Sequence, residues 1–237
     1  MNLRLYIDYD NLNEHQKHKG LLDLITRSLL STPVPTTKIS GRCEVRVYGG
    51  WYEATTLTPL AQKVIAELGR DFPTVLPVCN KEGFTGKLNV SAELACSLEA
   101  EPSQHLFNTF RVKSAPRALK CDHPSTKGCA ELDCPLTILP VLFDTEKCPR
   151  NGCSIGLHDI VFRREQKLID TMLTCDLIHS ARTGNDFMML VSSDDDLLPA
   201  IRVALISGTP FARLHPKKYY QLAAFPPGGA HFIEKEV

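Results

Sequence analysis

Two apolar runs that each end in carboxylates constrain the fold more than any other feature of the chain. The first run, 3–7, leads directly into Asp8, and the second, 187–191, leads through two serines into Asp194. A short unbroken apolar run is typical of a strand buried on both faces of a parallel sheet. Parallel strands end at one edge of their sheet, where α/β proteins bind ligands. The two acidic tips are therefore expected to meet.

The sequence between these runs alternates between the spacings of helices and strands. Such alternation predicts a parallel α/β sheet flanked by helices. Pro, Gly and Lys predict a loop over 72–90, and 90–98 fits a short helix. The other predicted helices are 21–30, 58–68, 164–181 and 195–206, and the other predicted strands are 45–48, 107–113 and 211–214.

Length and charge narrow the class of protein. A chain of 237 residues with 43% apolar residues suits one large domain, or one domain with an insertion. Lys+Arg and Asp+Glu both number 27, so nucleic acid would have to bind a local basic patch. No run approaches the roughly 18 apolar residues of a membrane span, and no signal-peptide pattern precedes the first strand. We therefore expect a cytoplasmic chain with reduced cysteines and no membrane contact.

The segment 114–157 differs from the rest of the chain in composition, which predicts an inserted subdomain. It contains two Cys-x₄-Cys pairs and little periodicity. Paired cysteines on tight turns are the usual ligands of structural Zn²⁺, and the metal would supply folding free energy that a small core lacks. Free cysteines in a loop are the alternative interpretation. The candidate ligands are Cys129, Cys134, Cys148 and Cys153, with Cys121 and His123 competing for the same places.

A third acidic side chain is expected to join the two strand tips. Asp170 and Asp176 lie in one predicted helix, but six positions turn them about 120° apart, so only one can face a shared centre. We choose Asp170, which leaves Asp176 at the edge of the site or in solvent. Several converging carboxylates are what Mg²⁺ or Mn²⁺ needs, and bound ions can activate water against a phosphodiester. Helix capping by Asp194, a turn at Asp8 and a solvated Asp170 are the structural alternatives.

Three short motifs contain the acidic side chains discussed above. They are Ile7-Asp8-Tyr9-Asp10-Asn11, Lys167-Leu168-Ile169-Asp170, and Val191-Ser192-Ser193-Asp194-Asp195-Asp196-Leu197-Leu198-Pro199. Together these motifs resemble the NYN family of PIN-like nucleases, and they depart from the usual pattern at Leu168, Ser193 and Leu197. The resemblance implies a Rossmann-like sheet, an Mg²⁺ or Mn²⁺ site and hydrolysis of RNA by an activated water.

The resemblance also implies roles for particular residues. Asp8, Asp170 and Asp194 would hold the ions, Asp196 would support them, and Asn11 would orient a water or a carboxylate. The NYN domain would span 1–113 and 158–237. A non-catalytic RNA- or protein-binding module remains an alternative. So does a phosphatase, in which Asp8-Tyr9-Asp10 forms an Asp-x-Asp nucleophile motif.

Basic and aromatic residues suggest how an RNA substrate would bind. Cations beside an acidic centre would hold phosphates, and a tryptophan just past a strand end could stack a base. Ordinary surface charge and core packing are the alternatives. A protein partner or inhibitor is also compatible with the sequence, which does not specify an oligomeric state. The residues are Arg111, Lys113, Arg163, Arg164, Lys167 and Trp51.

Overall fold

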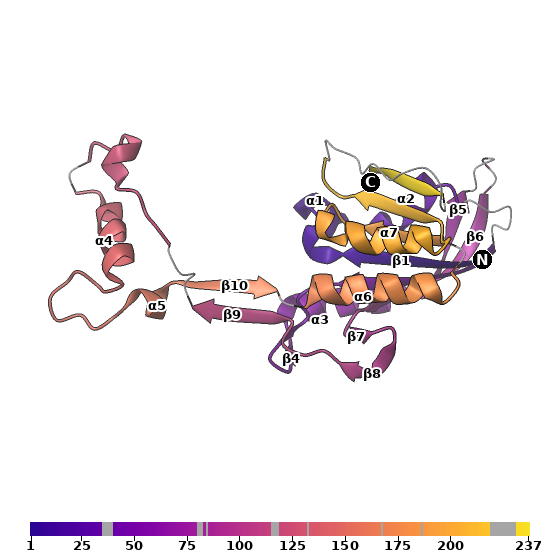
Figure 1. Cartoon of the computed structure of the whole chain (residues 1–237), viewed down its shortest axis with the longest axis horizontal. Coiled ribbons are helices and arrows are strands. Elements are labelled where there is room, and N and C mark those ends of the chain that lie inside the picture. The colour runs from indigo at the N-terminus through magenta and orange to yellow at the C-terminus, as the bar shows by residue number, and fades with distance from the viewer. Residues whose placement is uncertain are drawn as a thin grey trace. The chain divides into compact units, whose positions relative to one another are not determined.

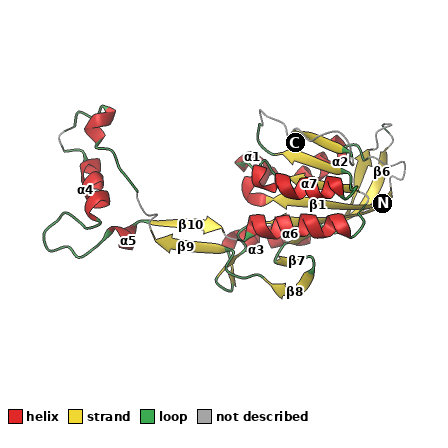
Figure 2. Ribbon diagram, viewed as in Figure 1, coloured by secondary structure: helices red, strands yellow, loops and turns green. Residues whose placement is uncertain are grey.

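The computed structural model divides the chain into two compact units (Figures 1 and 2). The first unit comprises Met1–Thr109 and Gln166–Val237, and the second comprises Phe110–Glu165. The second unit is thus longer at both ends than the insertion predicted at 114–157. The structure describes residues 1–34, 40–79, 83, 85–114, 119–131, 133–166, 168–185, 187–218 and 231–237, and within these it leaves out the side chains of 112, 114, 164 and 165.

A seven-stranded sheet forms the centre of the first unit. Its strands are β1 (Asn2–Asp8), β2 (Ser40–Tyr48), β5 (Thr74–Cys79), β6 (Thr85–Leu94), β11 (Phe187–Val191), β12 (Phe211–His215) and β13 (Phe232–Glu236). Their order is β13-β12-β11-β1-β2-β6-β5, and all pairs are parallel except β5 with β6. The predicted α/β class with a mostly parallel sheet is confirmed.

The order of the strands reverses beside β1. From β1 the chain continues to β2 on one side, whereas β11, β12 and β13 extend the sheet on the other. Ile7 of β1 is in register with Val191 of β11, so the two apolar runs end side by side. In open α/β sheets this reversal opens a crevice at the carboxyl ends of the strands, where ligands bind.

Helices cover both faces of this sheet. They are α1 (Glu14–Lys19), α2 (Leu21–Ser31), α3 (Pro59–Asp71), α6 (Ile169–Arg182) and α7 (Leu198–Ile206). Leu5 and Ile7 pack with α2 and α3 in one core cluster, whereas Tyr6 packs with α6 and α7 in another. This alternation follows from the two-residue period of a strand. Thr58 caps α3, because its hydroxyl accepts a hydrogen bond from the Ala61 N–H.

The predictions of a loop over 72–90 and a helix over 90–98 are wrong. β5 and β6 form an antiparallel hairpin there, with Thr74 in register with Val90. Buried Leu88 and Val90 alternate with exposed neighbours, a period of two that the polar composition obscured. Pro77 is tolerated because β5 is the edge strand of the sheet.

Shorter elements complete the description. They are β3 (Tyr52–Glu53), β4 (Thr56–Leu57), β7 (Ser97–Leu98), β8 (Glu101–His105), β9 (Phe110–Ser114), α4 (Ile138–Thr145), α5 (Leu157–Ile160), β10 (Phe162–Gln166) and the 3₁₀ turns η1 (Tyr9–Asn11), η2 (Pro124–Lys127), η3 (Pro135–Thr137) and η4 (Asp195–Leu197). In the second unit, Leu142 and Leu157 are the buried residues of a small apolar cluster. No helix in the described part of the chain is long and apolar enough to cross a membrane.

Candidate functional site

The ends of β1 and β11 meet through side-chain hydrogen bonds. Asp8 is only 6% exposed, and its Oδ2 accepts a hydrogen bond of 2.9 Å from the Ser192 hydroxyl. Ser192 Oγ also accepts the Asp194 N–H at 3.1 Å. Asn11 Oδ1 accepts the Ser193 N–H at 3.1 Å, which links the two loops a second time. The structure thus brings Asp8 and Asp194 to one place at the strand-order reversal.

Both aspartates also cap the turns that follow their strands. Asp8 Oδ1 accepts the Asn11 N–H at 3.3 Å at the start of η1. Asp194 Oδ1 accepts the Asp196 N–H at 2.9 Å at the start of η4. The capping interpretation is therefore correct for Asp194, and the hydrogen bond to Asp196 holds its carboxylate at the start of the 3₁₀ turn. Asp196 itself is exposed.

Asp10 belongs to the same cluster, although sequence analysis assigned it a role only in the phosphatase alternative. Its Oδ2 is buried and accepts no hydrogen bond from the described residues. Burial raises the pKa of this carboxyl, while the Gln166 side chain, the charge of Lys17 and the Gly50 N–H lower it. A buried, unpartnered carboxylate oxygen is unfavourable unless something binds it.

The negative charges of the neighbouring carboxylates affect the pKa of Asp8. Burial raises the pKa of Asp8 to about 6, with the Ser192 hydrogen bond opposing this and the charges of Asp10 and Asp170 adding to it. Asp170 is exposed in the first turn of α6. The helix begins after Leu168, whose φ of +72° is the left-handed conformation that glycine adopts most easily. This explains why glycine is usual there in the family that the motif resembles.

These oxygen donors suit a hard divalent cation in kind and charge. The unpartnered Asp10 oxygen and the raised pKa of Asp8 both show negative charge that local hydrogen bonds leave uncompensated. Among the described residues, however, no three His, Cys, Asp or Glu side chains are arranged so that they could hold a metal ion as they stand. Ion binding would therefore require these side chains to turn toward one point.

Two buried side chains of β12, Arg213 and His215, contact the acidic loop that follows β11. The fully buried Arg213 donates to Ser192 O at 3.3 Å and pairs with Asp195 at 2.9 Å. Burial lowers the pKa of His215, whose ring lies 2.9 Å from Glu234 and 3.3 Å from Ser193 Oγ. We infer that this network positions the Ser-Ser-Asp segment. Sequence analysis missed this network, because Glu234 lies on β13, a strand that was not predicted.

Both expectations for Asp176 are wrong. The residue is only 1% exposed and lies on the buried stripe of α6, not in solvent or at the edge of the site. Its carboxylate accepts hydrogen bonds from the Tyr48 hydroxyl at 2.6 Å and the Glu99 N–H at 2.8 Å. It also pairs with Arg46 at 3.1 Å. Asp176 therefore anchors α6 to the sheet.

The proposed base-stacking role of Trp51 is also wrong. Its side chain is completely buried, with Nε1 donating to Val47 O at 3.0 Å and its ring 5.7 Å from that of Tyr9. Trp51 packs in the core behind the crevice and cannot meet a base.

The basic residues predicted to hold RNA phosphates lie only partly within the described residues. Arg111 and Lys113 lie on β9 and Arg163 lies on β10, all in the second unit. The side chain of Arg164 and the whole of Lys167 lie outside the described residues. Placement of these cations beside the carboxylates stays a prediction.

One of the two cysteine pairs is brought together. A hydrogen bond from the Arg150 backbone, together with one between the Cys148 and Cys153 side chains, lowers the pKa of the Cys148 thiol. Cys129 and Cys134 are both free thiols. Of the competing ligands, His123 caps η2 through Nδ1, and the Cys121 thiol donates to Asp122 O at 3.6 Å.

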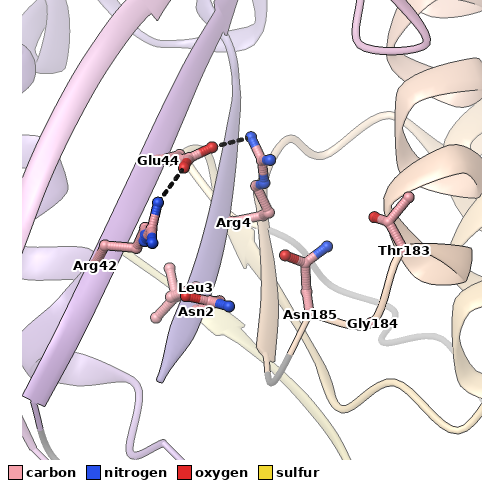
Figure 3. Close-up of a pocket in the computed structure, with 8 residues that line it drawn as sticks. All are labelled: Asn2, Leu3, Arg4, Arg42, Glu44, Thr183, Gly184 and Asn185. Carbon is pink, nitrogen blue, oxygen red and sulfur yellow. Dashed lines mark ion pairs between the residues drawn. The ribbon is translucent and has the colours of Figure 1, made fainter.

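A separate pocket lies at the opposite ends of the strands. It measures about 260 Å³ and is lined by the starts of β1 and β2 and by 183–185 (Figure 3). Glu44 forms ion pairs there with Arg4 and Arg42, which balances its charge. Because α/β sheets bind ligands at the carboxyl ends, we do not assign this pocket to the site.

Comparison with models of known protein families, with curated proteins and with solved structures finds no match to this chain.

Proposed function

We propose that the first unit is a metal-dependent endoribonuclease of PIN-like, NYN type. The observation that carries the proposal is the link from Asp8 through Ser192 to Asp194, at the reversal of strand order, beside the unpartnered oxygen of Asp10. Several carboxylates near the carboxyl ends of parallel strands suit a cation that acts on phosphate esters.

Each residue then has a defined role. Asp8, Asp10, Asp170 and Asp194 would hold Mg²⁺ or Mn²⁺, with Asp196 in support. When bound, the cation lowers the pKa of a water and stabilises the leaving oxygen of the phosphodiester. Asn11 fixes the geometry, since its backbone N–H binds Asp8 and its side chain binds the Ser193 N–H. Asp8 must be ionised to act as a ligand, so activity is expected to fall below pH 6.

We further propose that structural Zn²⁺ stabilises the second unit. Its small apolar cluster, with Leu142 and Leu157 as the buried residues, is insufficient to order a segment of this length without a staple. The Cys148–Cys153 turn supplies two thiols in contact, one of them with a lowered pKa. Cys129 and Cys134 would complete the site by moving toward them.

The test is cleavage of labelled single-stranded and structured RNAs in Mn²⁺, with a chelator control and mapping of the cut ends. Asp8→Asn and Asp194→Asn should both abolish cleavage while circular dichroism and gel-filtration profiles stay unchanged. Asp144→Asn, which removes the same charge from an exposed position on α4, should cleave normally. Undiminished cleavage by both site variants would refute the proposal.

The position of Asp10 also favours the phosphatase as a second candidate. In that chemistry Asp8 would attack phosphorus and Asp10 would act as acid and base. Because Asp10 now has a place in either mechanism, the substrate separates them. Release of phosphate from small monoesters, with RNA left intact, would identify a phosphatase. Inactivity on both substrates with intact RNA binding would identify a non-catalytic module.

A further inference from the structure

A basic hollow lies between the end of α1 and one face of α3. It has a volume of about 530 Å³, and its charged lining consists of Lys17, His18, Lys19, Lys63, Arg70 and a single carboxylate, Glu67. On α3, positions 63, 67 and 70 share one face because they follow the i, i+4, i+7 spacing of a helix. A nearly neutral chain thus concentrates positive charge in one concave place.

Two of the four lysine and arginine side chains, Lys19 and Lys63, carry charge that no ion pair neutralises among the described residues. Glu67, the single acid, is already engaged, because its Oε1 accepts the Leu21 N–H at the start of α2. In the described part of the chain, Lys19 and Lys63 form no ion pair, and both side chains are exposed. Arg70 pairs with Asp71 at 2.7 Å at the margin of the hollow.

The hollow adjoins the acidic cluster through Lys17. Its Nζ lies 5.7 Å from the centre of the Tyr9 ring, and it pairs with Glu14 at 3.1 Å. Tyr9 stands between Asp8 and Asp10 in η1, and Glu67 of the hollow acts electrostatically on its hydroxyl. Lys17, whose charge also lowers the pKa of Asp10, therefore belongs to the hollow and acts on the acidic cluster as well.

We propose that this hollow binds the phosphate backbone of RNA beside the cleavage site. The inference rests on the proposed function, because an acidic centre repels phosphates and needs neighbouring cations to retain the strand. RNA suits the lining better than an acidic protein does, since lysine is depleted from protein–protein interfaces. Lysine ammonium groups instead suit sequence-independent contact with phosphates.

The test measures the affinity of the whole chain for fluorescently labelled oligouridine. Binding is detected by fluorescence anisotropy, with a chelator present so that no cleavage occurs. For Lys19→Gln/Lys63→Gln, the affinity should fall, and the slope of log K against log salt should shrink by about 1.4, or about 0.7 per lost phosphate contact. Lys87→Gln, an exposed lysine on β6 outside the hollow, should behave as wild type. Thermal unfolding of each variant verifies that the fold is retained, and Lys63→Gln alone replaces the double variant if that one does not fold.

The outcomes separate this inference from the proposed function. Loss of binding in the hollow variant, with no cleavage by wild type, would support the RNA-binding hollow and reject the nuclease. Cleavage by wild type with unchanged binding and slope in the variant would overturn the hollow. Absence of RNA binding by wild type would also overturn it. Binding of polyglutamate as tightly as RNA, with the same dependence on the two lysines, would also overturn the inference and would indicate an acidic protein partner.

Discussion

Replacing Asp8 by asparagine is expected to stabilise the protein at neutral pH while it removes the proposed activity. Burial holds the pKa of Asp8 at about 6, against an ordinary value of 3.8. The folded chain therefore binds the proton more tightly than the unfolded chain does. Stability contributed by this group is greatest below pH 3.8 and is lost as the pH rises through 6. Above pH 6 the ionised Asp8 carboxylate destabilises the fold to its full extent.

The magnitude follows from the two pKa values. Each pKa unit is worth about 1.4 kcal/mol, so a rise from 3.8 to about 6 destabilises ionised Asp8 by about 3 kcal/mol. Asparagine removes that term, but its amide can accept only one of the hydrogen bonds from Ser192 and Asn11, a loss of about 1 kcal/mol. A net gain of about 2 kcal/mol should raise the midpoint of thermal unfolding by about 4–8 °C.

Thermal unfolding of wild type and Asp8→Asn in chelator, at pH 7.5 and at pH 4, measures this effect. The variant should be more stable at pH 7.5, and the gain should vanish at pH 4, where wild-type Asp8 is protonated. Asp144→Asn, which alters an exposed carboxylate, should show neither change. A variant that is less stable at pH 7.5, or a difference independent of pH, would refute the assignment of a buried, strained carboxylate.

Three further changes test other parts of the structure. Leu168→Gly should stabilise the fold by about 0.5–1 kcal/mol in urea, because relief of the left-handed strain exceeds the entropic cost of glycine, and lower stability would contradict this. Asp176→Asn should reduce the free energy of unfolding by about 2 kcal/mol, because buried Arg46 loses the nearest of its three carboxylate partners, whereas a surface role would leave the urea midpoint unchanged. Cys148→Ser/Cys153→Ser should abolish zinc binding and make the second unit sensitive to protease, and a chelator should have the same effect on wild type. If metal-free wild type resists protease as well as the untreated protein does, a zinc site is excluded.

The local pattern of apolar and acidic residues was sufficient to predict the central strands of the fold. The runs at 3–7 and 187–191 are too short and too uniformly apolar for surface helices, and parallel pairing then forces their acidic ends together. The link from Asp8 to Ser192 spans 184 positions in the chain, yet it follows from that one rule. The class of fold and the meeting of Asp8 with Asp194 could therefore be predicted.

Tertiary structure alone decided which polar side chains are buried and what faces them. Asp176 and Tyr48 lie 128 positions apart, and nothing local to either residue shows that they form a buried hydrogen bond. The burial of Trp51 and the unpartnered oxygen of Asp10 depend in the same way on neighbours from distant elements. Periodicity records the face on which a residue lies, whereas its surroundings are set by how the layers pack, and chemistry at a site depends on those surroundings.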